Sequence, residues 1–237
     1  MLQTRPTLAP YRQADAAREL DLARRAEAAS ACRAAFVLSL RARGIRDTAV
    51  LGAMERVPRE LFAPRRLADL ARTDVALPLP CGQTMTAPGT VATMLVALAP
   101  EAGHRVLEIG TGSGYVAGLL ARIGCAVRSV ERYATLAEEA AARLRLAGYE
   151  VAIEIGDGLA HAGRERFDRI LLNGTVAAVP RTLTSLLAPG GRLVAGLVQD
   201  GFPHLAVAER GGDGTLAEQT GAPVRLSPLV AGHAQVL

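Results

Sequence analysis

Residues 105–115, which read RVLEIGTGSGY, decide the fold of this chain. The segment begins with a short apolar run of the kind that forms a buried strand. The glycines that follow suit a tight turn, and without a Cβ atom they let a ligand approach the backbone closely. A helical pattern then runs over residues 116–124. A strand, a glycine-rich turn and a helix in this order predict a βαβ unit with a ligand site at the carboxyl end of the strand.

The same pattern recurs towards the C-terminus. Strands that alternate with helices of about 10–15 residues indicate parallel βαβ units, with helices on both faces of an open sheet. The tail differs, because residues 204–210, a GGDGT turn and a further extended stretch predict an antiparallel hairpin at the sheet edge. The fold class predicted is therefore α/β, a doubly wound and mostly parallel Rossmann-like sheet. Its further strands are expected at 125–131, 150–158, 167–174 and 190–198, and its helices at 135–148 and 182–190.

The N-terminal part is expected to be helical. The first 13 or so residues look frayed, and residues 15–44 have the Ala/Leu/Arg composition and spacing of one or two helices. Asp47 or Thr48 is expected to cap a further helix that Pro58 ends. Residues 74–90 are rich in Pro, Gly and Thr and predict a loop, after which a helix resumes at 91–99.

Composition excludes several classes of protein. The 237 residues are 50% hydrophobic and 21% charged, which excludes general disorder. No segment reaches the roughly 18 unbroken apolar residues of a membrane span, and the N-terminus shows no apolar signal core. We therefore expect a cytoplasmic protein without membrane partners.

Metal and nucleic-acid sites are also disfavoured. The three cysteines are widely spaced and form no ligand cluster with the four histidines, so we expect neither a disulfide scaffold nor a bound metal. The net charge is only +4, every basic residue is Arg, and four Phe, four Tyr and no Trp leave little material for stacking bases.

Acidic residues end three consecutive predicted strands: Glu108, Glu131 and Asp157. A carboxylate at Glu131 can accept both hydroxyls of a ribose, and Asp157 can accept from an adenine amino group. Glu108 would repel a pyrophosphate, which argues against a nicotinamide dehydrogenase. S-adenosylmethionine fits better, because its sulfonium and amino groups are cationic. The cofactor-binding residues predicted are Glu108, Gly110, Thr111, Gly112, Gly114, Glu131, Asp157 and Gly158.

From about residue 36 to its end, the chain resembles the protein-L-isoaspartate (D-aspartate) O-methyltransferase family. The glycine turn alone indicates only a methyltransferase. The pair VPRELF (57–62) and GQT (82–84) is much more specific. Further matching stretches are GIRDTAVLGAMERVPRELFAP (44–64), ALPLPCGQT (76–84), VERY (130–133), GDG (156–158), FDRILL (167–172), APGGRLV (188–194) and VRLSPLV (224–230).

The resemblance implies S-adenosylmethionine as cofactor and methylation of the free α-carboxylate of L-isoaspartyl residues in damaged proteins or peptides. The ester then collapses through a succinimide, which repairs the chain. In the family, a serine hydroxyl of the enzyme holds the substrate carboxylate. The resemblance places this hydroxyl at Thr86, the predicted catalytic residue. The substrate-binding residues it implies are Gln83, Thr84, Thr86, Asn173 and Thr175. A monomer or weak homodimer is expected.

Two stretches depart from the family pattern, and both lie on the substrate side. Ala87 and Gly89 replace a glutamine and an aromatic residue, and residues 173–177 read NGTVA where the family usually has TAAAP. Two alternatives therefore stay open: a carboxylate methyltransferase of a dedicated peptide or small molecule, and a non-catalytic module that only binds the cofactor.

The predicted organisation is a helical extension followed by one enzymatic domain. Residues 1–35 form the partly frayed extension, and residues 36–237 form the methyltransferase domain. Within that domain we expect a helical substrate-side region (36–100), a cofactor-binding βαβ core (101–200) and C-terminal edge strands (201–237).

Overall fold

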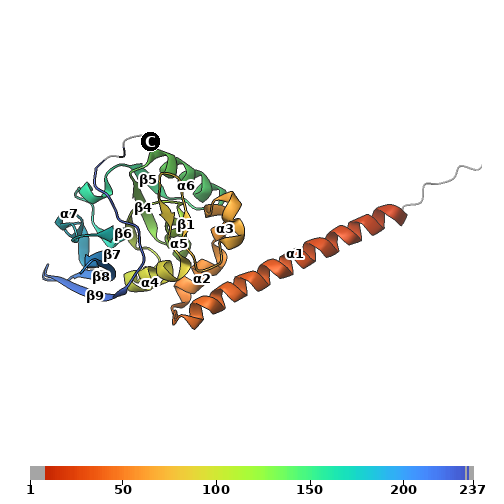
Figure 1. Ribbon diagram of the computed structural model, residues 1–237, viewed down its shortest axis with the longest axis horizontal. Coiled ribbons are helices and arrows are strands. Elements are labelled where there is room, and N and C mark those ends of the chain that lie inside the picture. Colours follow the sequence, from red (N-terminus) through yellow and green to blue (C-terminus); the bar gives the residue numbers. More distant parts are fainter. Residues whose placement is uncertain (1–8, 233, 235–237) are drawn as a thin grey trace, which may run out of the picture.

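The computed structural model describes residues 9–232 and 234. Most of the N-terminal stretch predicted to be frayed lies outside these residues. The described chain begins with one long helix, α1 (Ala9–Ala42), which projects from the rest of the molecule as a rod (Figure 1). The sequence predicted one or two helices up to Gly44, and there is one. Towards its end Phe36 and Leu40 are buried, so the end of α1 anchors it to the core.

A seven-stranded sheet forms the centre of the molecule, in the order β5-β4-β3-β6-β7-β8-β9. Strands β3 to β7 run parallel, and β8 and β9 are antiparallel. This confirms the predicted fold class, including the C-terminal hairpin. The strands are β3 (Arg105–Ile109), β4 (Ala126–Glu131), β5 (Ala152–Ile155), β6 (Phe167–Val176), β7 (Leu187–Gln199), β8 (Phe202–Arg210) and β9 (Leu216–Pro223).

The order of the strands locates the ligand site. β3 pairs with β4 on one side and with β6 on the other, so the chain reverses its direction of winding at β3. In open α/β sheets ligands bind outside the carboxyl ends of the strands at this switch point. The ends of β3 and β6 therefore border the expected crevice.

The helices begin and end largely where the sequence predicts. The Asp47 side chain caps α2 by accepting from the backbone N–H of Val50 at 2.8 Å, and α2 ends just before Pro58. The helices after α1 are α2 (Thr48–Arg56), α3 (Arg59–Phe62), α4 (Pro88–Leu98), α5 (Tyr115–Ile123), α6 (Ala134–Leu146) and α7 (Arg181–Thr184), with 3-10 turns η1 (Arg65–Leu70) and η2 (Gly158–Ala160).

Two local predictions were wrong. The expected loop at 74–90 contains a small antiparallel hairpin, β1 (Leu77–Pro78) and β2 (Thr84–Met85). Its turn is tight because Cys81 and Gly82 both have positive φ, at 57° and 64°, the backbone twist that two-residue hairpins favour. The helix expected after Pro180 is the single turn α7, because the chain already enters β7 at Leu187.

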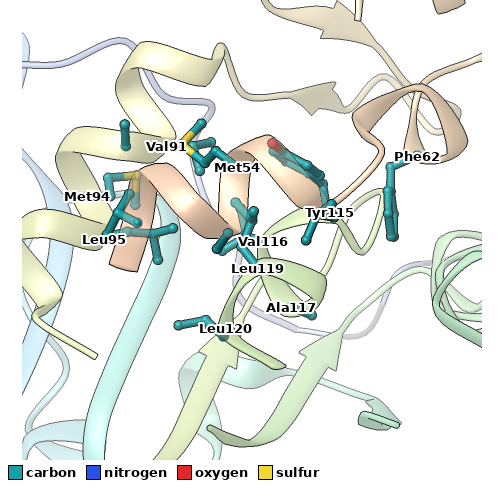
Figure 2. Packing of buried hydrophobic residues seen from close by; sticks show 14 of the residues in the cluster. Met54, Phe62, Val91, Met94, Leu95, Tyr115, Val116, Ala117, Leu119 and Leu120 are labelled. Carbon is teal, nitrogen blue, oxygen red and sulfur yellow. The ribbon is translucent and has the colours of Figure 1, made fainter. Parts of the chain in front are cut away.

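Side chains that alternate along the strands divide the core into two layers. One layer lies between the sheet and α2, α4, α5 and α6. Figure 2 shows Met54 of α2, Met94 of α4 and Tyr115 of α5 gathered in this layer, together with Phe62 of α3. The opposite layer includes Leu107, Ile109 and other strand residues, and α7 contributes to it through Leu183. Within residues 9–232, no helix combines the length and apolar character needed to cross a membrane.

Candidate active site

A cavity opens at the carboxyl ends of β3, β4 and β6, at the predicted switch point. It holds about 900 Å³ of empty space, part of which is open to solvent. Its lining comes from the glycine turn, the hairpin β1–β2 with the residues that follow it, and residues 227–230. The predicted site residues that line it are Gln83, Thr84, Thr86, Gly110, Thr111, Gly112, Glu131, Asp157, Gly158 and Asn173.

The glycine turn follows β3 directly. Gly110, Gly112 and Gly114 have φ values of 91°, 55° and 86°, in the left-handed region that favours glycine. Gly114 does not line the cavity. A Cβ at Gly114 would lie 3.0 Å from the Cβ of Ala140 in α6, so this glycine serves helix packing and not the lining.

Glu131 ends β4 beside the turn. Its Oε2 accepts the backbone N–H of Gly112 at 2.8 Å, and its Oε1 accepts that of Tyr133 at 3.1 Å. The residue is only 5% exposed and lines the cavity. Each carboxylate oxygen keeps acceptor capacity beyond its one backbone bond, so Glu131 can still accept from hydroxyl groups of a ligand.

Asp157 lies at the end of the next strand and links three backbone groups. Its Oδ1 accepts from the N–H groups of Leu159 and Ala160, which caps η2. Its Oδ2 accepts the N–H of Gly232 at 2.6 Å. Asp157 therefore fixes a cavity wall and also the C-terminal segment.

Glu108 is the exception among the three acids, and the prediction that it faces the ligand needs correction. It is 0% exposed and does not line the cavity. The Ser129 hydroxyl donates to Oε2 at 2.6 Å and is itself 2.6 Å from the Thr111 hydroxyl, while Oε1 has no partner among the described residues. Burial raises the pKa of Glu108 to about 8, and the charge of Glu131 also raises it. Glu108 is thus a neutral, buried acid that supports the turn through Ser129 and Thr111. Of the three acids, only Glu131 and Asp157 face the cavity.

The substrate side is formed by the hairpin, by Thr86 and by the end of β6. The Thr86 carbonyl accepts from Nη2 of Arg59 at 2.9 Å. Asn173 donates through Nδ2 to the Gly110 carbonyl at 3.2 Å. Its Oδ1 is buried without a hydrogen-bond partner among the described residues, which leaves an acceptor at the cavity for a ligand donor.

Thr175 is placed differently from the prediction. It is 4% exposed and does not line the cavity. Its backbone N–H donates to the Ser227 carbonyl, and its carbonyl accepts from the Leu229 N–H, both at 2.9 Å. Thr175 thus anchors the C-terminal segment through its main chain.

The C-terminal segment 227–230 is the main part of the site that sequence reasoning missed. All four of its residues line the cavity. Arg132 donates through Nη1 to the Val230 carbonyl at 3.1 Å. A Cβ at Gly174 would lie 2.7 Å from both the Leu229 side chain and the Ser227 carbonyl, so glycine is needed there. The stretch VRLSPLV was part of the family resemblance, and that was the available signal.

Comparisons with known proteins identify relatives that match most of the chain. A family model described as protein-L-isoaspartate(D-aspartate) O-methyltransferase (PCMT) matches residues 31–234. A protein-L-isoaspartate O-methyltransferase of Azorhizobium caulinodans is 47% identical over 216 residues, which cover 89% of this chain and 98% of the relative. A protein-L-isoaspartate O-methyltransferase 2 of Rhodopseudomonas palustris is 46% identical over 205 residues, 85% of this chain and 94% of the relative.

A solved structure shares the fold at lower identity. It is a Plasmodium falciparum chain described as a beta-aspartate methyltransferase (PCMT), in complex with S-adenosyl-L-homocysteine. The two chains are 20% identical with a TM-score of 0.73, over 83% of this chain and 97% of the other. Since the family model and the bacterial relatives each match most of the sequence, this chain belongs to the protein-L-isoaspartate(D-aspartate) O-methyltransferase family.

Proposed function

We propose that this protein uses S-adenosylmethionine to methylate the free α-carboxylate of L-isoaspartyl residues in damaged proteins and peptides. The observation that carries the proposal is that the glycine turn and the Thr86 segment line the same cavity. One cavity can thus hold a nucleoside cofactor and a carboxylate acceptor side by side. The family assignment favours this acceptor over a dedicated small molecule and over a module without turnover.

The residues present fit the cofactor. Gly110 and Gly112 offer a backbone without Cβ atoms to the cavity. The carboxylates of Glu131 and Asp157 give the cavity a negative lining that suits a cation. The orphaned Oδ1 of Asn173 suits a donor such as an amino group. We assign the ribose to Glu131, the adenine to Asp157 and Gly158, and the remaining contacts to Gly110, Thr111 and Gly112.

The chemistry asks for positioning more than for proton transfer. When bound, S-adenosylmethionine supplies an electrophilic methyl group. The acceptor carboxylate, with an ordinary pKa of about 3.9, is already ionised at neutral pH, so this chain needs no general base. We assign the Thr86 hydroxyl to hold that carboxylate by a hydrogen bond to the charged oxygen, with Gln83 and Thr84 beside it. Alignment of this kind can lower a barrier by about 7–11 kcal/mol.

The organisation of the chain follows from the same interpretation. Phe36 is the first buried side chain of α1 among those described, which supports residues 1–35 as an extension to a methyltransferase domain of residues 36–237. We further propose a cytoplasmic monomer or weak homodimer that binds neither nucleic acid nor membranes, since its net charge is only +4 and it has few aromatic residues.

A pair of peptides tests the function. One carries an L-isoaspartyl residue and the other a normal aspartyl residue at the same position, and both are incubated with methyl-labelled S-adenosylmethionine. We expect base-labile label in the isoaspartyl peptide alone. Equal labelling of both peptides, or none in either, would refute the proposal.

A further inference from the structure

A buried arginine lies directly behind the Thr86 segment. Arg59 begins α3 and is 0% exposed. Its Nη2 donates to the Thr86 carbonyl at 2.9 Å, and its Nη1 donates to the Ala71 carbonyl. The guanidinium carbon lies 5.6 Å from the centre of the Tyr115 ring. One side chain thus ties the substrate side of the cavity to α3 and to the chain after η1.

This charge is not balanced by a direct ion pair. Among the described residues no carboxylate lies within ion-pair distance of Arg59, and its Nε has no hydrogen-bond partner. Burial lowers the pKa of the guanidinium, while Tyr115, Asp74 and Glu60 act against that shift from further away. A buried charge is a costly way to gain stability, since apolar residues of similar volume often do as well. We therefore relate Arg59 to the position of the segments that it hydrogen-bonds and not to the stability of the fold.

Arg59 hydrogen-bonds the main chain of a short segment between two buried residues, Met85 and Pro88. Thr86 lies between β2, which has two residues, and the start of α4 at Pro88. Beyond Thr86, the next support is Asp74, whose Oδ1 accepts the Gly89 N–H at 2.6 Å. The glycine turn has hydrogen bonds of its own, because Glu131 accepts the Gly112 N–H and the Ser129 hydroxyl lies 2.6 Å from that of Thr111. Arg59 reaches the turn only through its ring contact with Tyr115, the residue that follows it.

We propose that Arg59 is a positioning residue for methyl transfer: it fixes the main chain of Thr86 so that the hydroxyl faces the acceptor carboxylate. The inference rests on the proposed function. Arg59 lies outside the cavity lining, so it acts through Thr86 and not by contact with the substrate. A defect at Arg59 should therefore appear in the use of the peptide and not in the binding of the cofactor product.

Arg59→Met and Arg59→Lys test the proposal, with Arg72→Met as the matched control. Arg72 also stacks on an aromatic ring, that of Phe36, but it donates its hydrogen bonds to Glu60 and not to the Thr86 segment. We expect Arg59→Met to lower kcat/KM for the isoaspartyl peptide about 10- to 100-fold, and Arg59→Lys to fall between it and the wild type. S-adenosylhomocysteine affinity should stay within about twofold in both. Even where Arg72→Met lowers the melting temperature as much as Arg59→Met does, it should keep kcat/KM within about threefold of the wild-type value.

Hydrogen exchange separates this inference from the proposed function. Amide exchange is measured without peptide in the wild type and in Arg59→Lys. We expect residues 83–89 to exchange faster in Arg59→Lys than in the wild type, and residues 110–114 to exchange at the same rate in both. If the wild type methylates no isoaspartyl peptide, the function is wrong, while this measurement still tests the support of Thr86. Unchanged exchange at 83–89, unchanged kcat/KM in Arg59→Met, or an equal loss of cofactor-product affinity would each overturn the inference. If Arg59→Met does not fold, Arg59→Lys alone decides by the same criteria.

Discussion

The two sides of the cavity are built in different ways. The cofactor side is the turn from β3 into α5, and the neighbouring strand β4 holds it: the Gly110 N–H donates to the Val130 carbonyl and the Gly112 N–H to the Glu131 side chain. The substrate side is a small hairpin and a short segment, which side chains from the N-terminal helical region hold through Arg59 and Asp74. The cofactor side is thus held by a neighbouring strand of the sheet, whereas the substrate side is held by side chains from outside the sheet.

This difference explains where the chain departs from its family pattern. The expected departures at 87 and 89 lie beside Thr86, and those at 173–177 lie at the end of β6 and just after it, while the glycine turn keeps its motif. A turn with three positive φ values tolerates few residues. A segment held by bonds to its main chain keeps its position when its own side chains change, as Arg59 does for Thr86. The Thr86 segment can therefore vary without disturbing the sheet.

Gly112→Val should break the cofactor side with the largest effect. Valine is strongly disfavoured at a φ of 55°, and its methyl groups would project at the cavity lining. We expect the affinity for S-adenosylhomocysteine to fall at least about 1000-fold, or about 4 kcal/mol, in calorimetry. Gly82→Val is the control, since Gly82 has a similar φ of 64° in the hairpin turn with open space around it. It should keep the affinity within about threefold. Retained affinity in Gly112→Val would place the cofactor elsewhere.

Glu108→Gln should change how the stability of the cofactor side depends on pH. The pKa of Glu108 is raised from 4.5 to about 8 in the folded state. Between these values the folded protein keeps a proton that the unfolded chain has released, so the free energy of unfolding falls as pH rises through this window. The shift corresponds to about 5 kcal/mol at most, and relaxation around the buried charge reduces it. We expect Glu108→Gln to be more stable than the wild type by about 3 kcal/mol at pH 8 and about equal to it at pH 4.5.

Denaturant unfolding across pH measures this effect. Glu218→Gln, at an exposed position of β9, serves as the control and should follow the wild-type profile. If the Glu108→Gln and wild-type profiles run parallel from pH 4.5 to 8, then Glu108 is ionised in the folded protein and the account of a neutral acid under the turn fails.

Local patterns predicted the cofactor side well, because neighbouring residues determine it. The strand, turn and helix over 105–124 all formed as expected. The prediction for Glu108 was wrong because a residue near the end of a strand can point into the core and not towards the ligand. Alternation along β3 puts Glu108 on the same face as buried Val106, against the helices, and directly opposite Ser129.

The substrate side was harder to predict because its contacts join distant parts of the chain. Two-residue strands next to prolines are too short for any periodic pattern. The bonds from Arg59 to Thr86, and from Thr175 to Ser227 and Leu229, cross 27 residues or more. Such pairings follow from tertiary packing, and only the family resemblance connected these segments before the structure was available.

Thr86→Ala and Thr86→Ser test the substrate side by itself. Removing a hydroxyl that donates to a charged carboxylate costs about 1.5–3 kcal/mol, so kcat/KM for the isoaspartyl peptide should fall about 10- to 100-fold in Thr86→Ala. Thr86→Ser keeps the donor and should stay within about threefold of the wild type. Calorimetry should find S-adenosylhomocysteine affinity nearly unchanged in both. A variant that loses cofactor-product affinity and turnover equally would remove the role assigned to Thr86.

Asp157→Asn asks whether the C-terminal segment belongs to the cofactor side, and we expect the smallest effect here. Asp157 accepts backbone bonds through both oxygens, one of them from Gly232, and the amide of asparagine must turn a donor towards one of these groups. The loss of one such bond, about 1 kcal/mol, should speed amide exchange at residues 227–232 and weaken S-adenosylhomocysteine binding about fivefold. Asp213→Asn, which disturbs a similar turn in the distant β8–β9 hairpin, should change neither. If Asp157→Asn also raises KM for the peptide, the segment that Asp157 holds contributes to both the cofactor side and the substrate side. The two sides would then not be structurally separate at this segment. Unchanged exchange at 227–232 would show instead that the backbone pairing with Thr175 is sufficient to hold the segment in place.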